Sequence, residues 1–271
     1  MRSLVTRNNH SIDKNTRSVI SDRYKVVTKA VNTEFYDSSS DTTHSLYVGS
    51  YGRGTAIDTS DLDIMVILPE DEYERFDQYG NNGQSRLLQS VKDAVKSPYP
   101  RSDIRADGQV VKINFSDGMR FEILPAFERP ALYGPTTYIY PDSNMGGNWL
   151  PTNPKVEQEA MRKKDADSNG LLVDTCRHMR YVHSTYFKSY PLHGIVIDTF
   201  VYKAIGTWQW SNPGTLGTPT KGSYEKVLLD NWEYASAISP IPLHAPGSND
   251  QVEIESSNEC LGKVLHKMAD E

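Results

Sequence analysis

The segment from Gly49 to Leu68 constrains this chain most, because closely spaced glycines lead into paired carboxylates and an apolar strand. It reads GSYGRGTAIDTSDLDIMVIL and follows the short apolar run of residues 45–48. Glycine adopts tight backbone turns that other residues avoid. From Asp61 onward, apolar residues recur with a period of two, which predicts a strand. We therefore expect a glycine-rich turn that ends in a strand.

Asp61 and Asp63 give this strand its chemistry. Two side chains at positions i and i+2 of a strand project from the same face. Neighbouring carboxylates repel each other and are costly to hold unless a cation lies between them. Mg²⁺ prefers one or two carboxylates together with substrate phosphates, and the turn at Gly49 and Ser50 offers backbone N–H groups and a hydroxyl to such phosphates. These residue types predict a two-metal phosphoryl-transfer site.

Glu122 is the candidate for a third carboxylate. It lies in the second of two apolar runs, residues 109–115 and 119–127, which residues 116–118 separate as the turn of a hairpin does. Pro125 is expected to end the second strand. Another interpretation stays open from the residues alone, in which a glycine-rich loop leads into an edge strand whose aspartates are solvated.

The rest of the chain predicts an α+β fold. Residues 10–37 are expected to form one long helix with a single apolar stripe, capped by Ser11 or Asp13. Residues 84–96 form a second amphipathic helix, and the Pro- and Gly-rich region 129–156 is expected to be a long connection. Five helices should follow it, at 155–166, 168–188, 193–209, 223–237 and 256–269.

These elements predict three parts of the chain. They are an N-terminal spine helix, a lobe carrying the strands and a helical lobe, at 1–40, 41–150 and 151–271. A glycine-rich loop at 214–222 and a turn segment at 240–247 interrupt the last part.

Charge and cysteine content limit the partners and the compartment. The chain of 271 residues carries a formal charge of −6 and has no run of Lys and Arg. It has two cysteines, Cys176 and Cys260, which we expect to be reduced thiols because no Cys/His cluster has zinc spacing. No stretch of roughly 18 apolar residues and no secretory leader occur. We therefore expect a cytoplasmic protein with no membrane association and no nucleic-acid activator.

The glycine-rich segment resembles the signature of the DNA polymerase β-like nucleotidyltransferases. The shared pattern is Gly-Ser, a Gly-Thr pair, an apolar residue and then Ser-Asp-x-Asp before an apolar strand. This chain supplies it with Gly49, Ser50, Gly54, Thr55, Ile57, Ser60, Asp61 and Asp63. More narrowly, the chain is similar to the 2′-5′ oligoadenylate synthases and to the bacterial cyclic-oligonucleotide synthases of anti-phage defence. The resemblance covers residues 45–127 well and implies a catalytic lobe with a mixed sheet, plus a helical lobe braced by the N-terminal helix.

The resemblance also implies a role for each site residue. Asp61 and Asp63 would bind both of two Mg²⁺ ions, for which Mn²⁺ could substitute. Glu122, where the family more often has Asp, would be the third ligand and would help the acceptor hydroxyl lose its proton. Gly49 and Ser50 would hold the donor phosphates. Further candidates for contact with the triphosphate are Arg180, Ser184 and Lys203. For Arg180 the alternative is an ordinary helix arginine that is solvated or salt-bridged.

The implied activity is the joining of nucleoside triphosphates (ATP, GTP or UTP) into a cyclic di- or trinucleotide, with release of pyrophosphate. The product would be a second messenger in anti-phage defence, read by a separate effector protein, and the enzyme is expected to be a monomer. Two alternatives stay open. The same metal site would serve a nucleotidyltransferase that modifies an antibiotic, a tRNA or a protein, or that makes linear oligonucleotides. A non-catalytic nucleotide-binding protein is the third hypothesis, which the intact carboxylates disfavour.

Overall fold

Two compact units make up the chain in the computed structural model, which describes residues 3–59, 61–211, 223–238 and 242–269. The unit that holds the large sheet comprises Asp13–Gly52 and Asp61–Pro154. The helical unit comprises Met1–Ile12, Arg53–Ser60 and Lys155–Glu271. The chain thus leaves the sheet unit in the middle of the glycine-rich segment and returns to it at Asp61. The three-part division predicted from the sequence stays a prediction.

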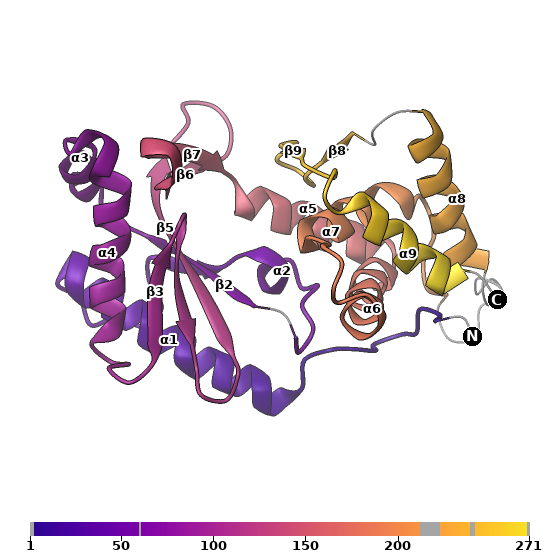
Figure 1. Ribbon diagram of the computed structural model, residues 1–271, viewed down its shortest axis with the longest axis horizontal. Coiled ribbons are helices and arrows are strands. Elements are labelled where there is room, and N and C mark those ends of the chain that lie inside the picture. The colour runs from indigo at the N-terminus through magenta and orange to yellow at the C-terminus, as the bar shows by residue number, and fades with distance from the viewer. Residues whose placement is uncertain (1–2, 60, 212–222, 239–241, 270–271) are drawn as a thin grey trace. The chain divides into compact units, whose positions relative to one another are not determined.

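The sheet is mixed, as predicted (Figure 1). Its strands lie in the order β1 (Ser45–Tyr47), β2 (Leu62–Ile67), β5 (Arg120–Arg129), β4 (Val110–Asn114) and β3 (Asp103–Asp107). The central strands β2 and β5 are parallel, whereas β1 pairs with β2, β4 with β5 and β3 with β4 in antiparallel fashion. The predicted hairpin is confirmed as β4 and β5, although no prediction was made for β3.

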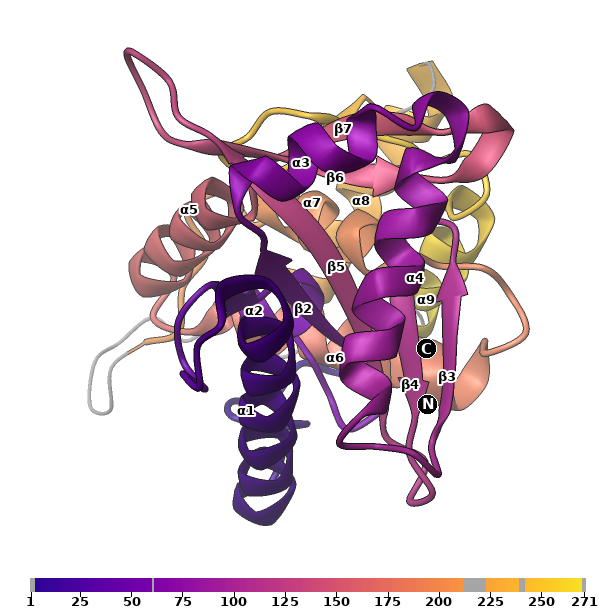
Figure 2. The same cartoon turned by 90° about the vertical axis from the view of Figure 1, so that its left-hand side faces the viewer.

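Helices α1 (Lys14–Tyr36) and α4 (Gly83–Lys96) lie side by side across one face of the sheet (Figure 2). Both confirm the helices that their apolar stripes predicted. The Asp13 carboxylate accepts hydrogen bonds from the N–H groups of Asn15 and Thr16, so Asp13 rather than Ser11 caps α1. Two shorter helices complete this unit, α2 (Gly49–Gly52) in the glycine-rich turn and α3 (Glu70–Asp77) after β2.

Both faces of the sheet carry buried apolar side chains. Ile64 and Val66 of β2 and Ile123 of β5 are fully buried, as expected for the face that α1 and α4 cover. The opposite face, called the second face below, carries another apolar cluster, which consists of Val48, Met65, Ala126 and Tyr138. Asp63 stands two residues before Met65 and therefore belongs to the second face.

The region 129–156 is not the long connection that its composition predicted. It contains a hairpin, β6 (Thr137–Asp142) and β7 (Asn148–Thr152), which pairs with β5 and extends the sheet. Tyr138 of β6 is fully buried, so this hairpin contributes to the core. Pro151 is tolerated in β7 because, among the described strands, β7 pairs with β6 alone and is an edge strand. Proline and glycine here mark an edge and a turn rather than an absence of strands.

Pro125 does not end its strand, contrary to the prediction. β5 continues to Arg129. On one side Pro125 is the register partner of Val66. On the other side, pairing with β4 reaches only Ile123 and pairing with β6 begins at Phe127. The proline therefore falls between two ladders, where a missing N–H group is tolerated.

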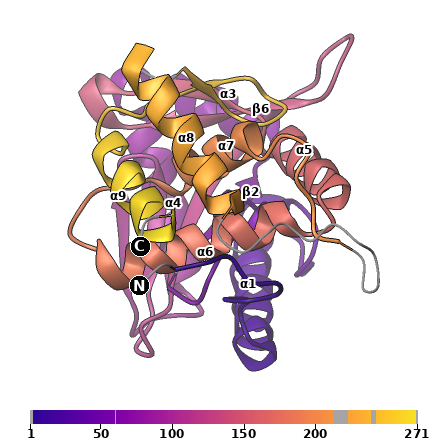
Figure 3. The same cartoon turned by 90° about the vertical axis from the view of Figure 1, so that its right-hand side faces the viewer.

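The helical unit contains the helices predicted for the second half of the chain (Figure 3). They are α5 (Pro154–Asp167), α6 (Leu171–Tyr186), α7 (Gly194–Ala204), α8 (Ser223–Ile238) and α9 (Asn258–Ala269). Helix α6 contacts α7 and α9, and α8 contacts the same two helices, so the four enclose one apolar core. Cys176 and Cys260 are free thiols, as predicted, and both are buried.

Short irregular segments connect these helices. A small hairpin begins in the predicted turn segment with β8 (Leu243–His244) and ends beyond it with β9 (Gln251–Val252). The loop predicted at 214–222 and the proline at 240 lie outside the described residues. In the part of the chain that the structure describes, no helix has both the length and the apolar content to cross a membrane.

The N-terminal segment before α1 is bound to the helical unit by buried polar side chains. The N–H group of Val5 donates to Glu225 at 2.9 Å. His178 of α6 lies with its Nε2 atom 2.7 Å from the carbonyl oxygen of Ser3 and its Nδ1 atom 3.3 Å from Nε2 of His10. Burial lowers the pKa of His178 to about 4, against a smaller opposite effect of the Ser3 carbonyl.

Acidification should therefore destabilise the protein through His178. Its pKa is about 4 in the folded chain against an ordinary value of 6.5, so the unfolded state binds more protons between these values. The contribution of this group to stability is complete above about pH 6.5 and falls by up to about 3 kcal/mol as the pH drops to about 4. Urea denaturation between pH 7 and pH 4 should show this slope, and His178→Gln should remove most of it. An equal slope in both proteins would assign the acid sensitivity to other groups.

Candidate active site

Strands β2 and β5 bring the predicted carboxylates together. In their parallel register Asp63 is the direct partner of Glu122, so the two side chains leave adjacent strands on the second face. Asp61 lies one residue before β2, and its ion pair with Arg120, which shares the face of Glu122 in β5, puts it on the same side. Three carboxylates from neighbouring strands therefore lie at one end of this face.

Two of these carboxylates have cationic partners within the sheet unit. Nε of Arg120 lies 2.6 Å from Oδ1 of Asp61. Nζ of Lys112, the register partner of Glu122 in β4, lies 3.3 Å from Oε1 of Glu122 and 2.7 Å from Oδ2 of Asp107. The hydrogen bond to Asp107, together with the Glu122 charge, raises the pKa of Lys112 above its ordinary value. Arg120 and Lys112 thus offset the mutual repulsion of the carboxylates.

Gly49 lies directly against Asp63 in a position that requires glycine. Its φ is +56°, a region that residues with a side chain rarely adopt, and a Cβ atom there would overlap the Asp63 carboxylate. The N–H group of Val48 also donates to the carbonyl oxygen of Asp63 at 2.9 Å. The turn with Gly49 and Ser50 is therefore fixed beside a carboxylate of the predicted site.

Gly49→Ala should damage the site more than the fold. The methyl group would displace the Asp63 carboxylate, and a misplacement of about 1 Å at a reacting centre costs up to about 100-fold in rate. We expect nucleotide transfer to fall about 10- to 100-fold, measured as initial rate at saturating substrate. Gly80→Ala is the control, because Gly80 also has a φ of +56° but has no atom within 4 Å of an added Cβ. Equal losses in both variants would show that backbone strain, not contact with Asp63, is responsible.

The donor set suits a hard divalent cation, because the three candidates are all carboxylates and Mg²⁺ prefers oxygen ligands. Among the residues that the structure describes, no three His, Cys, Asp or Glu side chains already stand in a metal-binding arrangement. Instead, Asp61 and Glu122 are turned toward Arg120 and Lys112. A bound divalent ion would replace Arg120 and Lys112 as the positive partner of Asp61 and Glu122. The residues fit such an ion in kind, in number and in being on one face.

Arg180, predicted to contact a triphosphate, belongs to the helical unit. It is 7% exposed, and its guanidinium binds Oδ1 of Asp198 at 2.6 Å and the carbonyl oxygen of Gly194 at 2.9 Å. This is the salt-bridged state that the sequence left open as the alternative. A role of Arg180 at a triphosphate stays a prediction.

Ser184 and Lys203 also belong to the helical unit. The Ser184 hydroxyl donates to the carbonyl oxygen of Tyr181 at 3.1 Å, one turn back in α6. Lys203 is exposed near the end of α7, and its Nζ atom donates to the carbonyl oxygen of Pro242 at 3.4 Å. The contacts of Ser184 and Lys203 with phosphates also stay predictions.

Sequence reasoning did not predict the ion pairs of the carboxylates. Arg120 is expected on the face of Glu122, because alternate residues of a strand share a face, but its pair with Asp61 and the pair of Lys112 with Glu122 depend on strand register, which is not visible in a sequence. Asp198 was missed as well, although a single carboxylate within the apolar run IVIDTFV predicts a buried ion pair.

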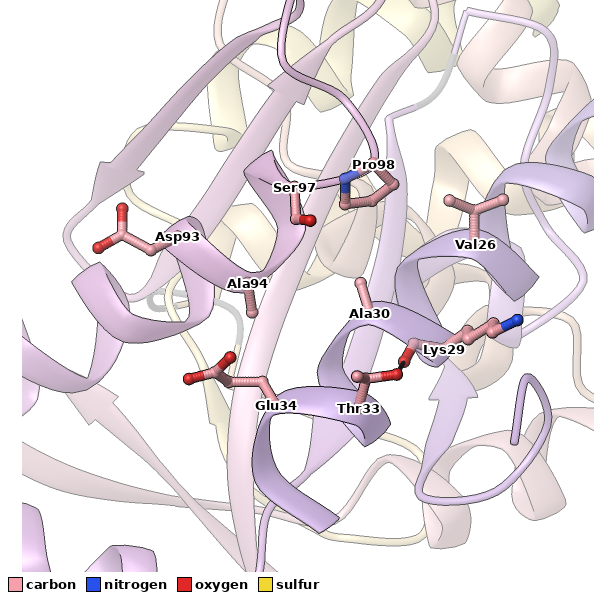
Figure 4. A pocket seen from close by; sticks show the side chains of 9 residues that line it. All are labelled: Val26, Lys29, Ala30, Thr33, Glu34, Asp93, Ala94, Ser97 and Pro98. Carbon is pink, nitrogen blue, oxygen red and sulfur yellow. Dashed lines mark hydrogen bonds between the residues drawn. The ribbon is translucent and has the colours of Figure 1, made fainter. Parts of the chain in front are cut away.

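A groove of about 340 Å³ lies between α1 and α4 (Figure 4). Its lining mixes apolar and charged side chains from the two helices and the turn after α4: Val26, Lys29, Ala30, Thr33, Glu34, Asp93, Ala94, Ser97 and Pro98. None of the predicted site residues is among them. The groove is therefore separate from the carboxylates on the second face.

A known protein family matches this chain. The profile of the Second Messenger Oligonucleotide or Dinucleotide Synthetase domain matches residues 5–165, more than half of the 271-residue chain. The chain belongs to this family. It is accordingly a nucleotidyltransferase, as the glycine-serine turn and the paired carboxylates predicted. Enzymes of this family use divalent metal ions.

The name of a curated relative also describes a nucleotide synthase. The protein called "Probable cyclic nucleotide synthase" of Bacillus cereus strain VD146 is 26% identical over 132 residues. These residues are 46% of this chain and 39% of the relative. The match therefore spans about two fifths of that protein's length.

Solved structures share the fold over nearly the whole chain. The CdnE cyclic dinucleotide synthase of Elizabethkingia meningoseptica, solved with GTP and Apcpp, has a TM-score of 0.65 at 13% identity and covers 98% of this chain and 93% of its own. The CdnE c-UMP-AMP synthase of Rhodothermus marinus, solved with Apcpp and Upnpp, has a TM-score of 0.62 at 14% identity, with coverage of 97% and 92%. CdnG of Bradyrhizobium diazoefficiens, in complex with GTP, has a TM-score of 0.62 at 12% identity, with coverage of 97% and 86%. At such identities the likeness shows the fold.

Proposed function

We propose that this enzyme joins two or three nucleoside triphosphates into a cyclic di- or trinucleotide and releases one pyrophosphate for each bond formed. The observation that carries the proposal is the register of β2 and β5, which puts Glu122 beside Asp63 with Asp61 two residues away. Three carboxylates next to a glycine-serine turn are the groups that nucleotidyl transfer from a triphosphate requires.

In the proposed reaction a ribose hydroxyl of one nucleotide attacks the α-phosphorus of another, and the bond to the pyrophosphate breaks. Asp61, Asp63 and Glu122 would hold two Mg²⁺ ions, or Mn²⁺ in their place, which would supply positive charge to the triphosphate and to the attacking oxygen. Glu122 accepts the proton that the hydroxyl loses. Backbone N–H groups at Gly49 and the hydroxyl of Ser50 bind the donor phosphates. A further transfer with the roles of donor and acceptor exchanged closes the ring.

The substrates we propose are ATP, GTP or UTP. Two structural relatives were solved with GTP and two with Apcpp, one of these also with Upnpp. The name of the matched domain describes an oligonucleotide or dinucleotide product that acts as a second messenger. We propose that this messenger is made in the cytoplasm by a monomeric enzyme without a nucleic-acid activator, and that a separate effector protein reads it in anti-phage defence.

Purified protein incubated with labelled nucleoside triphosphates tests the proposal directly. The four nucleotides are supplied together and then singly, with Mg²⁺ or Mn²⁺, and the products are treated with phosphatase and separated. A labelled product that resists phosphatase and has the mass of a cyclic di- or trinucleotide supports the proposal. Size-exclusion chromatography with light scattering checks the monomer, and added duplex DNA should leave the rate unchanged.

The alternative activities give different products in the same assay. Linear oligonucleotides lose their terminal phosphates to phosphatase, so they are distinguished from rings. Transfer of a nucleotide to an antibiotic, a tRNA or a protein would give no product until that acceptor is added. Product formation only with such an acceptor would contradict cyclic synthesis while leaving the nucleotidyltransferase assignment intact.

A further inference from the structure

Asp198 of α7 is a fully buried carboxylate with an unusually complete set of partners. Its Oδ1 atom accepts from Nη1 of Arg180 at 2.6 Å. Its Oδ2 atom accepts from Nε of Arg53 at 2.8 Å and from the Thr55 hydroxyl at 3.0 Å. All four residues belong to the helical unit. Arg53 also reaches Glu157 of α5 at 3.2 Å, so two arginines and two carboxylates form one network.

Arg53 and Thr55 occupy a special place in the chain. They lie in Arg53–Ser60, which interrupts the sheet unit between the Gly49-Ser50 turn and Asp61. This segment is embedded rather than exposed, because Thr55, Ala56 and Ile57 are buried. Nη2 of Arg177 in α6 also donates to the carbonyl oxygen of Gly54 at 2.8 Å. The middle of the glycine-rich segment is thus built into the helical unit.

The Asp198 carboxylate keeps its negative charge in the folded protein. Burial alone would raise its pKa, but the adjacent guanidinium groups of Arg180 and Arg53 hold that pKa below its ordinary value. It is therefore ionised at any pH at which an enzyme of this kind works. Hydrogen bonds to a charged acceptor are about twice as strong as those between neutral groups, so Arg53 and Thr55 have little freedom to move.

We propose that Asp198 is a positioning residue for nucleotidyl transfer. Asp198 holds Arg53 and Thr55 in place and so holds the segment to which they belong. Along the chain, this segment follows the phosphate-binding turn and precedes Asp61. The role rests on the proposed function, in which the turn holds donor phosphates and Asp61 is a metal ligand. Reacting groups lose up to about 100-fold in rate when they are misplaced by about 1 Å, so the support of these two ends controls the rate.

Thr55→Val tests this role without breaking the ion pairs of the network. Valine has the shape of threonine and removes one donor to Asp198, while Arg53 and Arg180 stay bound. We expect amide hydrogen exchange in residues 53–59 to rise about tenfold and kcat to fall about tenfold, at a temperature where the unfolding curve shows the variant to be fully folded. Thr55→Ser keeps the hydroxyl and should restore both values to within about twofold of the parent protein.

The outcomes separate positioning from simple stability. A residue that only stabilises the fold would lower the unfolding midpoint of Thr55→Val without changing kcat below it, and this result would overturn the proposal. Equal impairment of Thr55→Val and Thr55→Ser would overturn it too, because the loss would then not depend on the hydroxyl. If the parent protein makes no nucleotide product, the proposed function fails. The exchange of residues 53–59 then still decides whether the hydroxyl bonded to Asp198 holds the segment.

Discussion

Replacing Asp61 and Asp63 together by asparagine should lower nucleotide transfer by more than about 1,000-fold and leave the fold unchanged. Removal of a single preorganised charge-stabilising group from an active site already costs about 10²–10³ in rate, and these two carboxylates are proposed to hold both metal ions. Asparagine keeps the shape but loses the charge that a divalent ion needs. The measurement is the yield of labelled product from nucleoside triphosphates with Mg²⁺, compared with the circular dichroism of both proteins.

A control double variant changes two carboxylates of the same unit outside the site. Asp103→Asn with Asp117→Asn removes exposed groups that pair with Arg105 and Arg23 at the surface. Exposed ion pairs contribute about 0–1 kcal/mol, so activity should stay within about twofold of the parent protein. Full activity of the Asp61 and Asp63 variant would remove the metal-site assignment. Equal loss in the control would point to the overall charge of the sheet unit instead.

The sequence was informative where short-range pattern decides structure. The spacing of Asp61 and Asp63 predicted one face of a strand, and the structure has a strand, β2, that contains Asp63 and begins one residue after Asp61. The apolar stripes of residues 10–37 and 84–96 predicted α1 and α4, because a 3.6-residue period reflects burial of one side of a helix. Glu122 was predicted from its position in a hairpin, and the register then put it beside Asp63.

Pairing between distant strands could not be read in the same way. Pro125 was expected to end a strand, but its neighbours on one side happen to stop at Ile123 and begin again at Phe127. The hairpin of β6 and β7 was hidden by its prolines and glycines, which mark turns and edge strands as well as loops. Residue type gives only a local preference. Whether a proline is tolerated in a strand depends on whether a neighbouring strand would accept a hydrogen bond from an N–H group at that position.

The ion-pair network around Asp198 depends on tertiary contacts alone. Arg53 and Thr55 lie within the glycine-rich segment, yet their partner Asp198 lies more than a hundred residues later. No local period connects the two positions. The sequence does indicate that Asp198 has cationic partners, because a carboxylate in the apolar run of α7 is too costly to bury without them. It does not indicate which residues they are.

Asp198→Asn should be the most destabilising single change of a charged residue among those discussed. Asparagine keeps the size of the side chain but removes the anion that Arg180 binds and one of the two anions that Arg53 binds, the other being Glu157. Breaking a buried ion pair by removing one partner costs about 3–5 kcal/mol. For a chain of this size that corresponds to a fall of roughly 10 °C in the unfolding midpoint. Tryptophan fluorescence is a suitable probe because Trp208, Trp210 and Trp232 belong to the helical unit.

The same chemical change at an exposed pair gives the comparison. Asp230 of α8 pairs with Lys226 one turn away, and the two side chains are 54% and 67% exposed. Asp230→Asn should cost less than about 0.5 kcal/mol. Since the pKa of Asp198 is lowered in the folded state, its contribution is present above its unfolded pKa of about 3.9 and is lost as the pH falls through the folded value. The two variants should therefore differ at neutral pH and converge in strong acid. Equal stability at neutral pH would mean that the buried arginines do not depend on Asp198, and the existing pair of Arg53 with Glu157 would then be sufficient for Arg53.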